Sequence, residues 1–114
     1  MAKLYNNNKN FLIIEMTREE ASSLGFGITV PGDLNFIICG SCNDEIKEEI
    51  YYIAGINEVF CKECLEDYIK GMNHCVDYDS LCYEINHFNI IAQKLGMSEK
   101  ASFTVDNKIV ISPN

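Results

Sequence analysis

The sequence predicts an α+β fold, and three observations carry this prediction. Short apolar segments rich in β-branched and aromatic residues predict strands, because such side chains fit a pleated, half-buried surface. Two longer segments repeat apolar residues at the spacing of a helix. Two C-x-x-C pairs then indicate a metal staple in a chain of only 114 residues, which is expected to form one domain over residues 1–114.

The N-terminal part begins with a polar, asparagine-rich stretch, residues 1–9, which is expected to be a loose chain end. Residues 11–16 are apolar and rich in β-branched side chains, so they predict a strand. Thr17 and Glu20 have the spacing of a capping box, in which each side chain bonds a free backbone N–H at the start of a helix. They predict a short helix over residues 18–24.

The middle of the chain is expected to alternate between loop and strand. Residues 25–35 carry three glycines and a proline and are expected to form a loop. The apolar residues 36–38 then lead directly into Cys39. Further on, residues 50–53 and 58–60 are expected to form two strands joined by a short turn, a β-hairpin.

The C-terminal half predicts two helices and a second hairpin. Residues 61–72 form the first helix, with an apolar face made by Leu65, Tyr68, Ile69 and Met72. A longer helix is predicted over residues 79–95, where Asp79 or Ser80 can cap the first turn. Its apolar face consists of Leu81, Ile85, Phe88, Ala92 and Leu95. The tail, residues 102–112, alternates on both sides of a central turn and predicts the hairpin.

The motif with the clearest chemistry is a set of two cysteine pairs, Cys39-Gly-Ser-Cys42 and Cys61-Lys-Glu-Cys64, separated by the eighteen residues 43–60. Two intervening residues let one turn of backbone point both sulfurs at a single ion about 2.3 Å away, and two such turns complete a tetrahedron. The second pair opens a predicted helix, whose positive end favours ionised thiolates. Cys39, Cys42, Cys61 and Cys64 are therefore predicted to hold one metal ion.

Zinc is the metal that four soft thiolates favour most. A redox role for the first pair and an iron centre of rubredoxin type stay open as lesser alternatives, although no βαβ pattern surrounds the first pair. Four thiolates leave no position for water or substrate, and no metalloprotease, deaminase, phosphate-loop or nucleophile-elbow motif occurs in the sequence. We expect one structural Zn²⁺, no catalytic residues and no enzymatic activity.

The predicted order of cysteine knuckle, hairpin and helix resembles the treble clef, the core of LIM-like and GATA-like zinc fingers. The two cysteine pairs and the segment YYIAGINEVFCKEC carry this resemblance, which covers about residues 36–72. A full LIM domain differs, since it uses eight ligands for two zinc ions. The resemblance implies a treble-clef zinc module with an N-terminal strand and short helix and a C-terminal long helix plus β-hairpin.

In its length and in the sequence around YYIAGINEVFC, the chain is also similar to small zinc-binding proteins of bacteriophages and mobile elements. Zinc-containing anti-CRISPR proteins that act on type II effector nucleases belong to this group. The resemblance implies a non-enzymatic inhibitor that binds the effector in the cytoplasm of a bacterial host and blocks DNA binding. Such effectors hold nucleic acid in basic channels, which an acidic protein can occupy. The sequence shows no secretory or membrane segment, in agreement with this location.

The charge balance favours a basic protein partner over nucleic acid or membrane. Seventeen acidic and nine basic residues give a net charge of −8, and Zn²⁺ with four thiolates would change it by +2 − 4, to about −10. Such a surface repels phosphate backbones, whose affinity for proteins comes largely from Lys and Arg. Acidic residues near the cysteines form the candidate contact face, unless they are only solvated: Asp44, Glu45, Glu48, Glu49, Glu63, Glu66 and Asp67. A GATA-like adaptor that binds nucleic acid and a cysteine-dependent enzyme are the alternatives, in that order.

A second metal site made by His74, Cys75, Cys82 and His87 also stays open. Cys82 and His87 are five residues apart, which separates them by about 140° around a helix. Cysteine is often buried without any metal. We therefore favour a packing role for these thiols over a second zinc.

Overall fold

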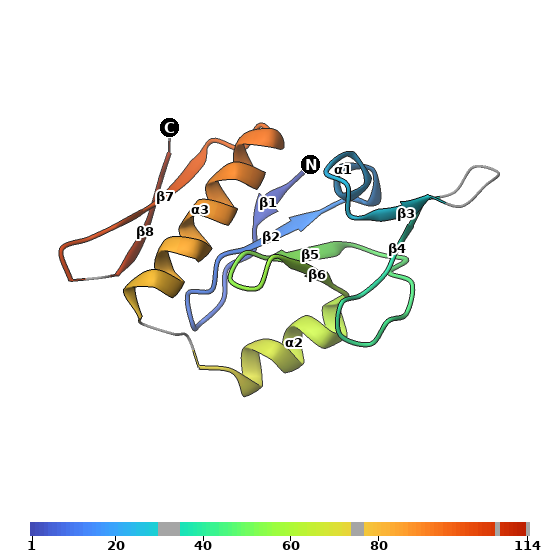
Figure 1. The fold of residues 1–114 in the computed structure, drawn as a ribbon, viewed down its shortest axis with the longest axis horizontal. Helices are drawn as coiled ribbons and strands as arrows, with labels where there is room; N and C mark the ends of the chain where they lie inside the picture. The colour runs from blue at the N-terminus through green and yellow to red at the C-terminus, as the bar shows by residue number, and fades with distance from the viewer. Residues whose placement is uncertain (30–34, 74–76, 107, 114) are drawn as a thin grey trace.

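In the computed structural model, which describes residues 1–29, 35–73, 77–106 and 108–113, the chain adopts the expected mixed α+β fold. A four-stranded antiparallel sheet forms its centre (Figure 1). In spatial order its strands are β1 (Lys3–Leu4), β2 (Ile13–Met16), β5 (Ile50–Ile53) and β6 (Glu58–Phe60). Two antiparallel hairpins flank it, β3 (Gly27–Thr29) with β4 (Asn35–Ile37) and β7 (Glu99–Phe103) with β8 (Ile109–Pro113). The helices are α1 (Arg18–Ser23), α2 (Lys62–Gly71) and α3 (Tyr78–Lys94).

The central sheet is buried on both faces. Neighbouring side chains of a strand point to opposite faces, yet all four residues of β5 are buried. Phe60 meets the ring of Tyr68 in α2 at a centroid distance of 6.0 Å, which brings α2 to the face that Phe60 occupies. On the other face Tyr52 meets Phe26, at 5.5 Å. Helix α2 and Phe26, the residue before β3, therefore lie on opposite faces of the β5–β6 hairpin.

The helix boundaries follow the predicted signals closely. The capping box of α1 is confirmed, because the Thr17 hydroxyl accepts a hydrogen bond from Glu20 N and the Glu20 carboxylate accepts one from Thr17 N. Helix α3 begins one residue earlier than expected, and the prediction of Asp79 or Ser80 as its cap was wrong. Asp77 caps it instead. Ser80 N lies in the first turn, where backbone N–H groups have no acceptor within the helix, and it donates to the Asp77 carboxylate at 3.3 Å.

The N-terminal stretch is not the loose end that its composition suggested. Strand β1 pairs with β2, with Lys3 opposite Glu15. The side chain of Asn7 then holds the following turn, donating to two backbone carbonyls and accepting from two backbone N–H groups. These bonds fix a polar segment that has little apolar surface of its own to bury.

Two further expectations need correction. The predicted loop over residues 25–35 contains β3, which pairs with β4 through Gly27 opposite Ile37; residues 30–34 lie outside the described part of the chain. Met72 does not join the apolar face of α2, because it is the C-cap with an extended backbone and its side chain is 49% exposed. The C-terminal hairpin is confirmed and begins earlier than predicted, at Glu99.

Candidate metal centre

The first cysteine pair lies on a tight reversal of the chain that follows β4. Cys39 N donates to Asp44 O at 2.9 Å, and Asn43 N donates back to Cys39 O at 3.0 Å. Asn43 makes this reversal possible by adopting a left-handed backbone, with a φ of 64°. The turn brings Cys39 and Cys42 to the same side, as the C-x-x-C spacing requires.

Gly40 fixes this reversal, the knuckle over residues 37–46, against the edge of the central sheet. Its N–H donates to Val59 O in β6 at 2.9 Å. A Cβ atom at this position would lie 3.2 Å from the Glu58 carboxyl carbon and 3.3 Å from the Phe60 ring. Only glycine lets the backbone approach β6 this closely without displacing those side chains.

The second cysteine pair is brought to the knuckle by the β6–α2 junction. Cys61 is the N-cap of α2 and Cys64 lies in its first turn. Leu65, one residue further on, is fully buried and anchors the start of the helix in the core. Strand β6 holds both cysteine pairs in place. Its Val59 O accepts the hydrogen bond from Gly40 in the knuckle, and its end leads directly into Cys61.

The four sulfur atoms converge. Those of Cys39, Cys42, Cys61 and Cys64 all lie within 4.8 Å of one another, and none of these cysteines forms a disulfide. A tetrahedral zinc site with bonds of about 2.3 Å needs sulfur–sulfur distances of about 3.8 Å, so small rotations of the side chains suffice. The four cysteines are therefore close enough to hold one metal ion, with Cys39 fully buried and Cys42 exposed.

Backbone N–H groups favour a thiolate at Cys39. Burial raises the pKa of this thiol, but hydrogen bonds from the backbone of Cys42, Cys61 and Ser41 outweigh it and lower the pKa to about 7. Two of these bonds, from Ser41 N and Cys61 N, measure 3.4 Å to the sulfur. Backbone donors of this kind support metal-bound thiolates, since they stabilise negative charge on sulfur.

The neighbouring thiols resist losing their protons in the absence of a cation. Burial raises the pKa of Cys64, hydrogen bonds with the adjacent thiols raise it further, and the pKa reaches about 12. At Cys42 a backbone hydrogen bond from Asp44 lowers the pKa, but desolvation and the nearby Cys39 sulfur outweigh it and the net shift is upward. A bound cation would compensate the negative charge that Cys42 and Cys64 acquire when they ionise.

The second hypothetical metal site receives no support from the described residues. His74 and Cys75 lie outside them. His87 forms a hydrogen bond through Nδ1 with Ala54 O at 2.9 Å, and Cys82 is half-buried beside the Tyr78 hydroxyl. Within the described part of the chain, the two C-x-x-C pairs are the one group of three or more cysteine, histidine or acidic side chains close enough to share a metal.

The predicted acidic face is largely exposed. Of its members, Glu45 is half-buried and pairs with Arg18 at 3.7 Å. The other six are exposed and form no ion pair with any described residue: Asp44, Glu48, Glu49, Glu63, Glu66 and Asp67.

One polar residue in the core, Glu84, was not predicted from the sequence. This residue of α3 is only 4% exposed, and its carboxylate accepts a hydrogen bond from Leu12 N at 2.9 Å. Glu84 lies between Leu81 and Phe88, on the apolar face of its helix. An acidic residue at that position was the available signal of a buried contact.

Comparisons with protein-family models, with curated proteins and with solved structures find no match for this chain. In the residues that the structure describes, every helix is too short or too polar to cross a membrane.

Proposed function

We propose that Cys39, Cys42, Cys61 and Cys64 hold one zinc ion whose role is structural. The observation that carries this proposal is the convergence of four sulfurs from two C-x-x-C pairs within 4.8 Å. Zinc suits an all-thiolate tetrahedral donor set, and it has no redox chemistry to maintain. When bound, the ion cross-links the knuckle to the start of α2 and completes its coordination with protein ligands alone.

The arrangement of these elements supports a treble-clef module. A knuckle carrying Cys39 and Cys42 precedes the β5–β6 hairpin, and α2 follows with Cys61 and Cys64 at its start. In Figure 1 the loop before β5 comes close to the N-terminal end of α2. This is the order of parts in the zinc fingers that the sequence resembles, so we extend the resemblance from sequence to architecture as part of the proposal.

The proposed activity of this scaffold is the binding of a basic protein. A net charge of −8 and six exposed carboxylates without ion pairs among the described residues favour a positively charged partner and disfavour phosphate backbones. The finer hypothesis, an inhibitor of a type II CRISPR effector nuclease, rests on the resemblance in sequence and stays a prediction.

Two measurements test the proposed function. Elemental mass spectrometry of protein purified without added metal should find one zinc per chain, and a chelator should then lower the melting temperature of the protein. Size-exclusion chromatography with a purified type II effector–guide complex should give a stable, salt-sensitive complex. Absence of zinc would refute the metal assignment, and absence of a complex would refute the inhibitor hypothesis. Retention of a DNA duplex at low salt would favour the GATA-like alternative.

A further inference from the structure

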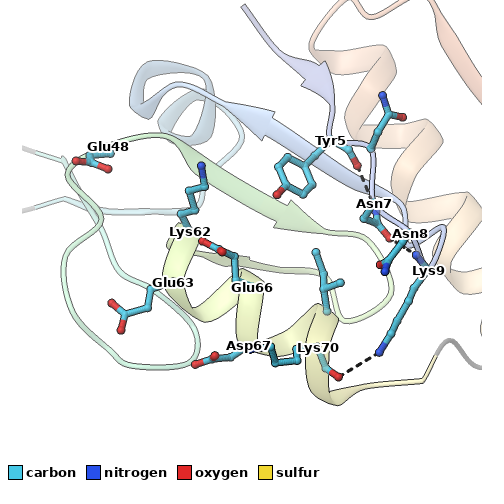
Figure 2. A pocket seen from close by; sticks show the side chains of 12 residues that line it. Tyr5, Asn7, Asn8, Lys9, Glu48, Lys62, Glu63, Glu66, Asp67 and Lys70 are labelled. Atoms are coloured by element: carbon cyan, nitrogen blue, oxygen red, sulfur yellow. Dashed lines mark hydrogen bonds between the residues drawn. The ribbon is translucent and has the colours of Figure 1, made fainter.

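A groove of about 870 Å³ runs between the N-terminal turn and α2 (Figure 2). One wall is the asparagine-rich segment around Asn7, and the other is the polar side of α2. Figure 2 shows Lys62 and Glu66 projecting from α2 on the side toward Tyr5. The groove begins beside the cysteine pairs, because Lys62 and Glu63 are the residues between Cys61 and Cys64.

The groove is preformed, since both of its walls are tied together. Lys9 extends from the N-terminal turn, and its ammonium group donates to Lys70 O at 3.2 Å and to Met72 O at 2.8 Å. These are free carbonyl groups at the C-terminal end of α2, where a positive charge is favourable. Asn7 rigidifies the turn itself through four hydrogen bonds with the backbone.

The remaining groups in the groove match an extended peptide. Asn6 and Asn8 are exposed and make no hydrogen bond with the described part of the chain, so their carboxamides can donate to and accept from a peptide backbone. Tyr5 and Ile69 are half-buried and offer apolar surface for the aliphatic stems of long basic side chains.

The charges favour a basic peptide over an acidic one. Four carboxylates line the groove against three ammonium groups, and the ammonium group of Lys9 is engaged by backbone carbonyls. If the proposed zinc is bound, four thiolates and Zn²⁺ add a net charge of −2 at the end of the groove near Cys61. Within the described residues, Glu63, Glu66 and Asp67 have no ion-pair partner.

We propose that this groove binds an extended segment rich in arginine or lysine, supplied by the partner protein. The inference rests on the proposed function and specifies which part of the acidic face makes the contact. It assigns the guanidinium or ammonium groups of the peptide to Glu66 and Asp67 on α2, and the backbone of the peptide to the asparagine wall.

The first experiment measures the affinity of a fluorescein-labelled arginine-rich peptide by anisotropy at low salt. The double variant Glu66→Gln/Asp67→Asn should raise the Kd roughly two- to thirtyfold, because it removes two exposed charge pairs. The matched control is Asp79→Asn/Asp106→Asn, which removes the same charge from exposed positions outside the groove and should leave the Kd within about twofold. Equal weakening by both double variants would overturn the inference, as would absence of peptide binding.

A second pair of variants tests the opposite wall. Asn8→Lys should weaken the peptide and Asn8→Asp should strengthen it, whereas Asn86→Lys, on the exposed side of α3, should change little. If neither change at Asn8 alters the Kd of the peptide, the groove assignment is overturned. Zinc content measured on every variant separates the two proposals, because loss of the groove contact leaves one zinc per chain, whereas a chain without zinc refutes the proposed metal centre itself.

Discussion

The substitution Cys42→Ala isolates the contribution of the metal cross-link to stability. Cys42 is exposed, so removing its sulfur leaves no cavity in the core. A metal bound to all four cysteines closes the loop over residues 43–60, which has eighteen residues. Closing a loop of about this length stabilises a fold by about 3 kcal/mol. In a chain of this size that loss should lower the Tm by roughly 10–15 °C.

The assay is thermal unfolding of the wild-type protein and the variant, each with one equivalent of zinc and again with excess EDTA. With zinc, Cys42→Ala should melt at the lower temperature and lose most of its metal. With EDTA the two proteins should melt together, because the cross-link is absent from both. An unchanged Tm with full metal content would refute the four-cysteine centre.

The matched variant Cys39→Ala should differ in EDTA. Cys39 is fully buried, and its sulfur accepts hydrogen bonds from Ser41 N and Cys61 N. Losing this acceptor should cost a further 1–3 kcal/mol, roughly, with or without metal. Identical melting of Cys39→Ala and Cys42→Ala in EDTA would show that these hydrogen bonds contribute nothing.

Three other predictions concern the rest of the chain. Phe88→Ala removes a fully buried ring and should lower the free energy of unfolding, measured by urea titration, by about 3–5 kcal/mol. The control is Ile90→Ala in the same helix. Ile90 is 51% exposed, so this change should lower the free energy of unfolding by about 1 kcal/mol or less. Burial raises the pKa of Tyr52 above its ordinary value of 10.0. The stability that this phenol contributes is therefore present below pH 10 and lost as the pH rises further. The urea concentration at the unfolding midpoint should fall between about pH 9 and about pH 11, and it should fall less in Tyr52→Phe. The double variant Cys82→Ser/His87→Ala should retain the zinc content of the wild type, and loss of a second equivalent would establish a second site.

The parts of the fold that the sequence predicts well are those with local signals. The capping box of α1 needs only Thr17 and Glu20, which interact within one turn of the chain. The cysteine cluster follows the same logic, because each C-x-x-C pair converges within a single turn of backbone. The β5–β6 hairpin between the two pairs was also predicted. The hydrogen bond from Gly40 N to Val59 O, which fixes the first pair against this hairpin, was not.

The parts that the sequence does not predict depend on distant partners. Strand β3 exists because Gly27 and Ile28 pair with Ile37 and Phe36, and glycines near it indicated a loop. Strand β1 is only two residues long and forms because β2 offers a free edge. The residues of such short strands have little intrinsic preference for an extended backbone, so hydrogen bonding to a neighbouring strand decides whether they form a strand.

The asparagine-rich turn shows how polar composition can conceal order. A segment with few apolar residues cannot offset the entropy of ordering by burial, and on that ground residues 1–9 were expected to be loose. Asn7 offsets this cost in another way, by four hydrogen bonds that replace a regular backbone ladder. Asn10 completes the turn with a left-handed backbone, with a φ of 59°, a conformation that asparagine tolerates well. The turn directs Lys9 onto the end of α2, so the side chains that made the segment look unstructured are those that build one wall of the groove.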